Sequence, residues 1–369
     1  MTCATIRAVM QVLHILKGLG LAGAENHLMI LLAGLREQGI DARMLLWVSA
    51  DNQADDIVKE AQRRSIPIER WVMPGNFAPG FFLKLVRYLR QQKPDIVHTH
   101  LVQAETYAIP AAKLAGVPHV INSSHNDDPF RRHPIFRLRS WILWRLTDKG
   151  IAISDTIRRF LIEVEGAHPE QIQTIYYGFT PLPIQKEETG VKLIGSVCRL
   201  VPQKGIAYAL DAVAKLTPEY PNLHYMIVGD GALRSTLELQ AKNLGISDRV
   251  QFLGWRKDAK ELMARFDIFL APSLWEGFGL VFLEAMAQSV PIVASRVSAV
   301  PEVVEDGKTG ILVPPRDPDS IASAIKNLLD NPELAKKMGE AGRERLTTTF
   351  TPQRMIEQTV TLYAEVMQS

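Results

Sequence analysis

The sequence predicts an α/β protein that contains two doubly wound parallel sheets in tandem. Short apolar runs rich in β-branched residues alternate with amphipathic stretches of helical period, which is typical of parallel sheets covered on both faces. The segment "TPLPIQKEETG" at 180–190 divides these runs into two series and has the composition of a linker. The 369 residues, 47% of them apolar, suffice for two cores. We therefore expect one domain over 1–185, a second over 186–350, and a last helix over 351–369 that packs on one of the two.

Five runs in the first series and six in the second are expected to form strands. They are residues 9–16, 42–48, 95–100, 119–125 and 149–154 in the first series, and residues 192–200, 223–230, 250–255, 267–273, 291–296 and 310–315 in the second. Ligands of doubly wound sheets bind beyond the carboxyl ends of the strands. A site is therefore expected in a cleft that the two sets of strand ends face.

Charge and composition argue against several classes of protein. The 42 Lys and Arg residues nearly balance the 40 Asp and Glu residues, so nucleic-acid binding driven by a field of one sign is not expected. Cys3 and Cys198 cannot form a disulfide framework, and no uninterrupted apolar stretch is long enough to span a bilayer. We expect a cytoplasmic protein, with peripheral attachment to the inner face of a membrane as a further expectation developed below.

A glycine-rich turn follows the first apolar run. Gly18, Gly20 and Gly23 have the spacing G-x-G-x-x-G, which also occurs in dinucleotide-binding folds. A nicotinamide-binding unit needs an acidic residue at the end of the second strand to hold the ribose, and Trp47 and Val48 occupy that place here. The glycines therefore predict a tight turn, either without a ligand or close to a phosphate.

The stretch "SLWEGFGLVFLEAMA" contains the strongest signal for chemistry. Glu276 lies in a predicted loop after a strand, and Glu284 falls on the following predicted helix. Backbone amides at Gly277 and Gly279 would face an anion at the helix start, and a carboxylate accepts both hydroxyls of a ribose. This pattern favours a nucleotide-sugar site, whereas a simple surface role for Glu284 conflicts with its apolar neighbours.

Basic side chains follow another predicted strand. Arg199 stands at the end of the strand at 192–200, Lys204 lies in the loop beyond it, and "VGDG" at 228–231 ends the next strand. Because the carboxyl ends of parallel strands share one sheet edge, Arg199 and Lys204 can reach a diphosphate there and stabilise the charge of a leaving group.

These motifs together resemble the retaining glycosyltransferase family 4, whose two-domain fold is called GT-B. The resemblance covers almost the whole chain and rests on "GLGLAGAE" at 18–25, "RLVPQKG" at 199–205, "VGDG" at 228–231, "PSLWEGFGLVFLEAMA" at 272–287 and "VPEVVEDGKTGILVPPRD" at 300–317. It implies that Arg199 and Lys204 neutralise the donor diphosphate, that Glu284 holds the ribose and that Glu276 contacts the transferred sugar. His125, at the end of the predicted strand at 119–125, resembles the histidine that contacts this sugar.

The resemblance also implies a donor-binding set and a reaction. The donor-binding residues it implies are Gly23, Gly229, Asp230, Gly277, Phe278, Gly279, Leu280 and Glu284. Transfer would retain the anomeric configuration and need neither a cofactor nor a bound metal, and the departing phosphate would help to deprotonate the acceptor. The chain departs from the family pattern at Ala22, at Ser298 and Ala299, and in "IYYGF" at 175–179, where Asn-Gly is usual.

Eight of the nine histidines lie in the first half of the chain. His98, His100 and His125 all stand at predicted strand ends, and three histidines can bind zinc. Their spacing fits no zinc motif and no carboxylate cluster accompanies them, so no metal site is predicted. A packed or hydrogen-bonded role is the expectation for His98 and His100.

Two basic segments carry aromatic residues, at 81–93 and at 129–148. The second contains five arginines and two tryptophans with no acidic residue before Asp148. Basic amphipathic helices of this kind can lie on an anionic membrane surface, and they can equally be ordinary domain helices with their aromatic residues in the core. Both interpretations remain open at this point.

The sequence thus predicts a retaining, hexosyltransferase-type glycosyltransferase that uses a nucleotide-diphosphate sugar, with a UDP-sugar expected as donor. The expected acceptor is a glycan or a lipid-linked sugar in the assembly of a cell-surface polysaccharide. The alternatives are a nucleotide-sugar epimerase of similar fold, which would lack the Glu276 and Glu284 pair, and an NAD-binding oxidoreductase, which would need the missing acidic residue.

Overall fold

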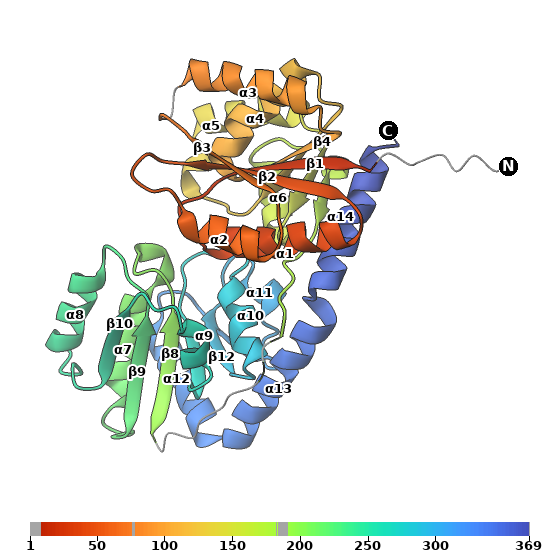
Figure 1. The fold of residues 1–369 in the computed structure, drawn as a ribbon. Helices are drawn as coiled ribbons and strands as arrows, with labels where there is room; N and C mark the ends of the chain where they lie inside the picture. The colour runs from red at the N-terminus through yellow and green to blue at the C-terminus, as the bar shows by residue number, and fades with distance from the viewer. Residues whose placement is uncertain (1–8, 76–77, 182, 184–190, 369) are drawn as a thin grey trace. The chain divides into compact units, whose positions relative to one another are not determined.

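The computed structural model describes residues 9–75, 78–181, 183 and 191–368, and it divides into two compact units (Figure 1). Unit 1 comprises Met1–Gly178 and Pro352–Ser369, and unit 2 comprises Phe179–Thr351. The chain passes from one unit to the other at 178–179 and returns at 351–352. The expected domain boundary at 185–186, most of the expected linker and Cys3 lie outside the described residues.

Unit 1 contains a seven-stranded parallel sheet in the order β3-β2-β1-β4-β5-β6-β7. The strands are β1 Gln11–Lys17, β2 Asp41–Val48, β3 Ile68–Val72, β4 Ile96–His100, β5 His119–Ser124, β6 Lys149–Ala152 and β7 Ile172–Thr174. The helices are α1 Gly23–Glu37, α2 Asp55–Arg63, α3 Pro79–Gln92, α4 Leu101–Ala115, α5 Pro134–Arg145, α6 Asp155–Glu163 and α14 Pro352–Val366.

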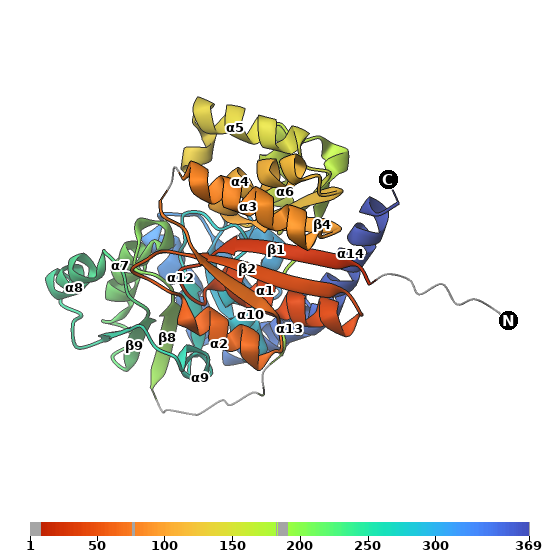
Figure 2. The ribbon, with the colours of Figure 1, turned by 45° about the horizontal axis from the view of Figure 1, so that its top comes forward.

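Two hydrophobic cores form on the two faces of this sheet. Helices α1, α2 and α14 bury one core, which includes Leu28, Ile57 and Tyr363, and helices α3 and α4 bury the other (Figures 1 and 2). Helix α14 approaches α1 closely at Gly34, where an added Cβ would lie 2.0 Å from the Cδ1 of Ile356. The last helix of the chain is therefore part of the core of unit 1.

Unit 2 contains a six-stranded parallel sheet in the order β10-β9-β8-β11-β12-β13. The strands are β8 Lys192–Val197, β9 Leu223–Val228, β10 Val250–Gly254, β11 Ile268–Ala271, β12 Ile292–Ser295 and β13 Gly310–Val313. The helices are α7 Ile206–Leu216, α8 Arg234–Asn243, α9 Ala259–Met263, α10 Leu280–Ala287, α11 Val300–Val303, α12 Pro318–Asp330 and α13 Pro332–Thr349. Helices α7, α8 and α12 bury the main core against the sheet.

The predicted α/β class and all eleven predicted strands are confirmed, and two strands were missed. β3 has the sequence "IERWV", in which two charged residues interrupt the apolar pattern, and β7 is only three residues long. Both are edge strands, so they need less apolar surface than the central strands. No helix within the described part of the chain is long and apolar enough to cross a membrane.

Each sheet has a point at which the direction of strand order reverses. In unit 1 it lies between β1 and β4, and in unit 2 between β8 and β11. The loops that leave two such strands diverge to opposite faces, so they leave a crevice between them at the carboxyl edge. This topology brings the loops after β8 and β11 together, and it brings the glycine turn after β1 near the end of β4.

Candidate active site

The loops after β8 and β11 meet at a backbone contact that only glycine permits. Gly205 has φ +63°, and a Cβ on it would lie 2.0 Å from the carbonyl oxygen of Pro272. The Leu274 amide donates to the Gln203 carbonyl at 2.7 Å, and the Gln203 side chain donates to the Trp275 carbonyl at 2.9 Å. These contacts fix the two loops against each other.

Lys204 and Glu276 form an ion pair across these two loops. The Ser273 hydroxyl donates to the same carboxylate oxygen of Glu276 at 2.9 Å. Glu276 is only 6% exposed, so both partners act on it in a region of reduced solvent screening. Two predicted site residues that are far apart in sequence are thus in contact, and the carboxylate is oriented before any ligand binds.

A cavity of about 10 Å³ lies behind this ion pair and is lined in part by Cys198, Lys204 and Glu276. A cavity of this size holds about one water molecule. Burial raises the pKa of the Cys198 thiol to about 12, so the thiol is protonated at neutral pH and does not act as a nucleophile. Lys204 and Glu276 are the charged side chains that line this cavity.

Glu284 lies on α10, the helix that follows the loop of Glu276. Its side chain is 23% exposed, and its carboxylate is 3.7 Å from the Nζ of Lys260. Burial raises the pKa of Glu284, and Lys260 only partly opposes this effect. The fold thus holds the Glu284 carboxylate where burial disfavours its charge, and one lysine at 3.7 Å is its ion-pair partner. The carboxylate therefore has capacity for further hydrogen-bond donors.

The remaining predicted residues of unit 2 divide into backbone and side-chain groups. Gly229 has φ +130°, and a Cβ added to it would lie 1.9 Å from the carbonyl oxygen of Cys198. The loop after β9 therefore also packs against the loop after β8. Asp230 caps this turn by accepting from the Gly231 amide at 2.7 Å, and it pairs with Arg234 at 3.1 Å. The Gly231 amide and Arg234 lower the pKa of Asp230, in that order. Arg199 is exposed beside this turn.

The start of α10 offers backbone groups rather than side chains. Gly279 has φ +85° and precedes the first helical residue, Leu280. Phe278 is 1% exposed, and its ring packs edge-on against Phe350 with centroids 5.6 Å apart. Of the predicted residues Gly277, Phe278, Gly279 and Leu280, the phenylalanine side chain is thus committed to the core.

The glycine turn of unit 1 is held by side chains from the segment after β2. The Asp56 carboxylate accepts from the Leu21 amide at 2.7 Å, and Asn52 donates to the Leu19 carbonyl at 2.7 Å. Glu25 accepts from the Ala22 amide at 3.2 Å, which caps the start of α1 next to Gly23. Asp56 therefore fixes the turn, in the region where a dinucleotide-binding fold would direct a carboxylate to a ribose.

His125 lies immediately after β5, and the structure engages both of its ring nitrogens. Nδ1 is 2.5 Å from the Tyr177 hydroxyl, and Nε2 is 3.1 Å from the Nδ1 of His100. Burial lowers the pKa of His125 to about 4. In this conformation the imidazole is neutral at neutral pH, and a contact of His125 with a ligand would involve the ring face, the ring carbons or the backbone.

The loop that carries His125 is held by a residue that the sequence analysis did not single out. Arg131 is 2% exposed and pairs with Glu165 at 2.6 Å and with Glu105 at 3.2 Å. Its guanidinium also donates to Ser124 and to the Asn126 carbonyl, each at 3.4 Å. The sequence contains one signal for Arg131, the cluster of arginines at 129–148, but this cluster does not distinguish a buried arginine from exposed ones.

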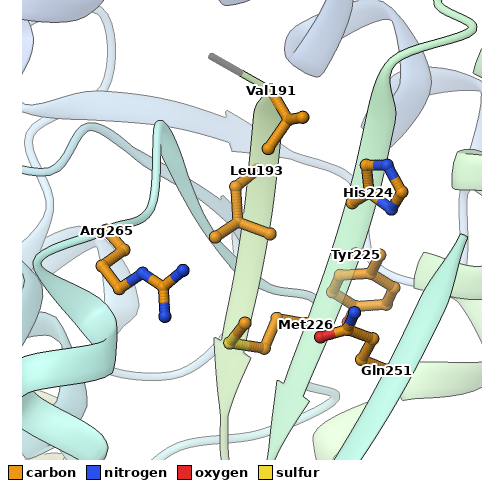
Figure 3. A pocket seen from close by; sticks show the side chains of 7 residues that line it. All are labelled: Val191, Leu193, His224, Tyr225, Met226, Gln251 and Arg265. Atoms are coloured by element: carbon orange, nitrogen blue, oxygen red, sulfur yellow. The ribbon is translucent and has the colours of Figure 1, made fainter. Parts of the chain in front are cut away.

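Another hollow of unit 2 lies elsewhere. It has a volume of about 170 Å³ and lies near the amino ends of β8, β9 and β10, where Leu193, His224, Gln251 and Arg265 line it (Figure 3). Ligands of doubly wound sheets bind at the opposite, carboxyl ends of the strands. We therefore place the candidate site at the Lys204 and Glu276 pair.

The environment of Glu284 predicts that its charge destabilises the fold. The pKa of Glu284 is raised in the folded state, so the folded protein binds a proton more readily than the unfolded chain does. The stability that the protonated Glu284 contributes is therefore lost as the pH rises above about 4.3, the ordinary pKa of a glutamate. Glu284→Gln should therefore raise the thermal midpoint at pH 7, with a smaller gain at pH 4.5. Differential scanning calorimetry measures this.

The matched control is Glu340→Gln on α13, where the glutamate is exposed. It should leave the midpoint within about 1 °C at both pH values, as most surface substitutions do. A lower midpoint for Glu284→Gln at pH 7 would show that the carboxylate stabilises the fold.

Comparisons with known proteins show the family to which the chain belongs. A family model described as Glycosyltransferase Family 4 matches residues 21–181, and one described as Glycosyl transferases group 1 matches residues 182–345. A glycogen synthase of Mycobacterium tuberculosis is 30% identical over 300 residues, which span 77% of this chain and 72% of that protein. An Escherichia coli enzyme named UDP-Gal:alpha-D-GlcNAc-diphosphoundecaprenol alpha-1,3-galactosyltransferase is 27% identical over 307 residues, 77% of this chain and 79% of that one.

Solved structures give the same fold. The Anabaena protein HepE in complex with UDP superposes with a TM-score of 0.82 and 23% identity, over 96% of this chain and 100% of that one. A glycosyltransferase from Rickettsia africae has a TM-score of 0.81 over 98% of this chain and 100% of its own length, at 19% identity. The two parallel-sheet units are thus the GT-B fold, and the chain belongs to the glycosyltransferases whose two parts are described as Glycosyltransferase Family 4 and Glycosyl transferases group 1.

Proposed function

We propose that this glycosyltransferase is retaining and metal-independent, and that it transfers a sugar from a UDP-sugar to a glycan or lipid-linked acceptor in cell-surface polysaccharide assembly. The observation that carries the proposal is the ion pair of Lys204 with Glu276, held by Ser273 at the carboxyl edge of unit 2. A relative whose name specifies UDP-Gal and a diphosphoundecaprenol-linked acceptor supports the donor and the acceptor class.

The donor is proposed to bind along the strand ends of unit 2. The backbone at Gly229 and Asp230 and at the start of α10 would contact the nucleotide and its phosphates, because amides at a helix start favour anions. The partly buried carboxylate of Glu284 would accept from both ribose hydroxyls, which supply closer donors than Lys260 at 3.7 Å. Glu276 would accept from hydroxyls of the transferred sugar. In unit 1, Gly23 and His125 are proposed to serve the phosphate and the sugar.

The proposed reaction exchanges two bonds on one face of the sugar. The bond from the anomeric carbon to the diphosphate oxygen breaks, the acceptor oxygen bonds to the same face of that carbon, and the acceptor proton passes to the departing phosphate. Lys204 and Arg199 would stabilise the negative charge that develops on the diphosphate. This reaction needs no carboxylate nucleophile, in contrast with that of retaining glycosidases. Glu276 is accordingly engaged by Lys204 and Ser273.

The first prediction from the proposed function concerns the donor nucleotide. UDP should raise the thermal midpoint more than GDP, ADP or NAD, since a ligand at one hundred times its dissociation constant contributes about 2.7 kcal/mol. Glu284→Ala should remove most of this stabilisation, and Glu340→Ala should keep it. Stabilisation by NAD alone would overturn the proposal and favour the dinucleotide interpretation of the glycine turn, and stabilisation by GDP or ADP alone would correct the base.

A second prediction concerns stereochemistry and metal. With an α-linked UDP-sugar, the product recorded by proton NMR at early times should carry an α linkage. The initial rate should stay unchanged after dialysis against EDTA, because Lys204 and Arg199 supply the positive charge. A β-linked product would refute retention, and a rate that falls with EDTA and returns with Mg²⁺ would refute metal independence.

We also propose that α5 attaches unit 1 to an anionic membrane surface. Ile135, Leu138 and Ile142 are 71%, 61% and 47% exposed at helical spacing, so they form one apolar stripe. Arg132, Arg137 and Arg145 are exposed near it, whereas Arg131 and Arg139 are engaged with Glu105. Trp144 is buried, so the aromatic residues of the segment divide between core and surface.

The third prediction tests this stripe. The protein should sediment with phosphatidylglycerol vesicles at low salt, and added salt should weaken this binding. Leu138→Glu together with Ile142→Glu should weaken vesicle binding by at least about tenfold. Two aliphatic side chains that become buried in the membrane contribute more than about 1.4 kcal/mol to binding. Leu239→Glu on α8, where the leucine is also exposed, is the control. Equal binding of the double variant and the wild type would refute the proposal.

A further inference from the structure

Seven buried side chains of unit 1 form one continuous chain of hydrogen bonds. It runs through Tyr177, His125, His100, His14, Tyr363, His98 and Ser123, with successive distances of 2.5, 3.1, 3.0, 3.3, 2.6 and 2.7 Å. Three neighbouring strands, the segment after β7 and helix α14 contribute to it. None of the seven is more than 9% exposed. This chain will be called the histidine chain.

The geometry favours hydrogen bonding over metal binding. His14, His98 and His100 each offer a ring nitrogen within 4.8 Å of the others, which is close enough to suggest a metal site. However, His14 and His100 lie nearly coplanar, at 13° with centroids 5.3 Å apart, so that their facing nitrogens point at each other at 3.0 Å. Every ring nitrogen of these three histidines already has a partner in the histidine chain. A metal would have to break these bonds.

The proton positions along the histidine chain are coupled. Burial lowers the pKa of His14 to about 3 and that of His125 to about 4, and it lowers those of His98 and His100 well below the usual value. A neutral imidazole has one donor and one acceptor nitrogen. Each link therefore dictates the next. With the Tyr363 proton bonded within the histidine chain, only two polarities are possible, one with the proton on Nδ1 of every histidine and one with it on Nε2.

Tyr363 links the two halves of the histidine chain. When the histidines carry their protons on Nδ1, the Tyr363 hydroxyl donates to Nε2 of His14 and accepts from Nδ1–H of His98. When they carry their protons on Nε2, both of these bonds reverse. A change of tautomer at His98 is therefore transmitted to His125 through Tyr363, His14 and His100.

We propose that the histidine chain holds His125 in the same neutral tautomer as His14, His98 and His100, and that Tyr177 and Tyr363 act through it as positioning residues for glycosyl transfer. The consequence for the reaction rests on the proposed function, in which His125 meets the transferred sugar. With both nitrogens bound inside the protein, His125 offers a rigid, uncharged surface there and does not exchange protons with the substrate. Tyr363 reaches it from the last helix of the chain, through two other histidines.

The tautomer can be measured directly on the full chain. In protein labelled with nitrogen-15 in histidine, the four histidines of the histidine chain should all carry the proton on the same ring nitrogen. In Tyr363→Phe, His14 and His98 lose the hydroxyl that links them, and His125 should show a mixture of both tautomers, although residue 363 is not hydrogen-bonded to it. Tyr88→Phe removes a hydroxyl that donates to Glu69 in the same unit and should leave the spectrum unchanged.

Each outcome decides the proposal. Different tautomers among the four histidines of the wild type, or an unchanged His125 in both Tyr363→Phe and Tyr177→Phe, would overturn it, and neither result depends on enzymatic activity. In the transfer assay, Tyr363→Phe should lower kcat about tenfold while the donor KM changes less than about twofold, because a misplaced group far from the nucleotide site affects the reacting geometry. Unchanged kcat with altered tautomers would refute the positioning role, and the UDP stabilisation described above tests the proposed function separately.

Discussion

The close approach of Gly205 to the Pro272 carbonyl is the constraint on which the candidate site of unit 2 depends. Any side chain at 205 would meet that oxygen, because a Cβ would stand 2.0 Å from it. The contact brings the loop that carries Lys204 against the loop that carries Glu276, and their ion pair follows from it. The parallel topology supplies the two loops at one edge, and the glycine removes the last obstacle to contact.

The same topology explains how much of the site the sequence could predict. Lys204 and Glu276 follow β8 and β11, and strands of such length and apolar content are visible in the sequence as short buried runs. Once both strands are placed in a doubly wound sheet, their following loops must meet. The side-chain role of Phe278 could not be predicted in this way, because its contact with Phe350 depends on how the chain after α13 packs.

The histidine chain marks the limit of sequence reasoning in unit 1. His98 and His100 were expected to be packed or hydrogen-bonded, and both are. Their partners depend on strand register, which pairs His14 with His98 across β1 and β4. Tyr363 is 265 residues away from His98 in sequence, and nothing in the local pattern of α14 distinguishes this tyrosine from an ordinary core residue.

Buried charge explains why the basic segment at 129–148 was ambiguous. Arg131 is enclosed by Glu105 and Glu165, and removing either partner would leave a buried charge without compensation. Arg137 and Arg145 belong to the same run of letters and are exposed. Periodicity assigns a residue to a face of a helix, but the partners that make burial of an arginine tolerable come from α4 and the segment after α6. They are recognisable only once the strands have been assembled.

Helix α14 gives unit 1 a dependence on the end of the chain that its amino-terminal sequence does not reveal. Residues 9–178 would fold without α14 only by leaving Gly34 and the core around Leu28 uncovered, and by leaving Nδ1 of His98 and Nε2 of His14 without the Tyr363 hydroxyl. A buried donor or acceptor without a partner costs about 1–3 kcal/mol. The polar histidine chain therefore makes the docking of α14 specific, because an apolar residue at 363 would fill the space but would leave two imidazoles unsatisfied.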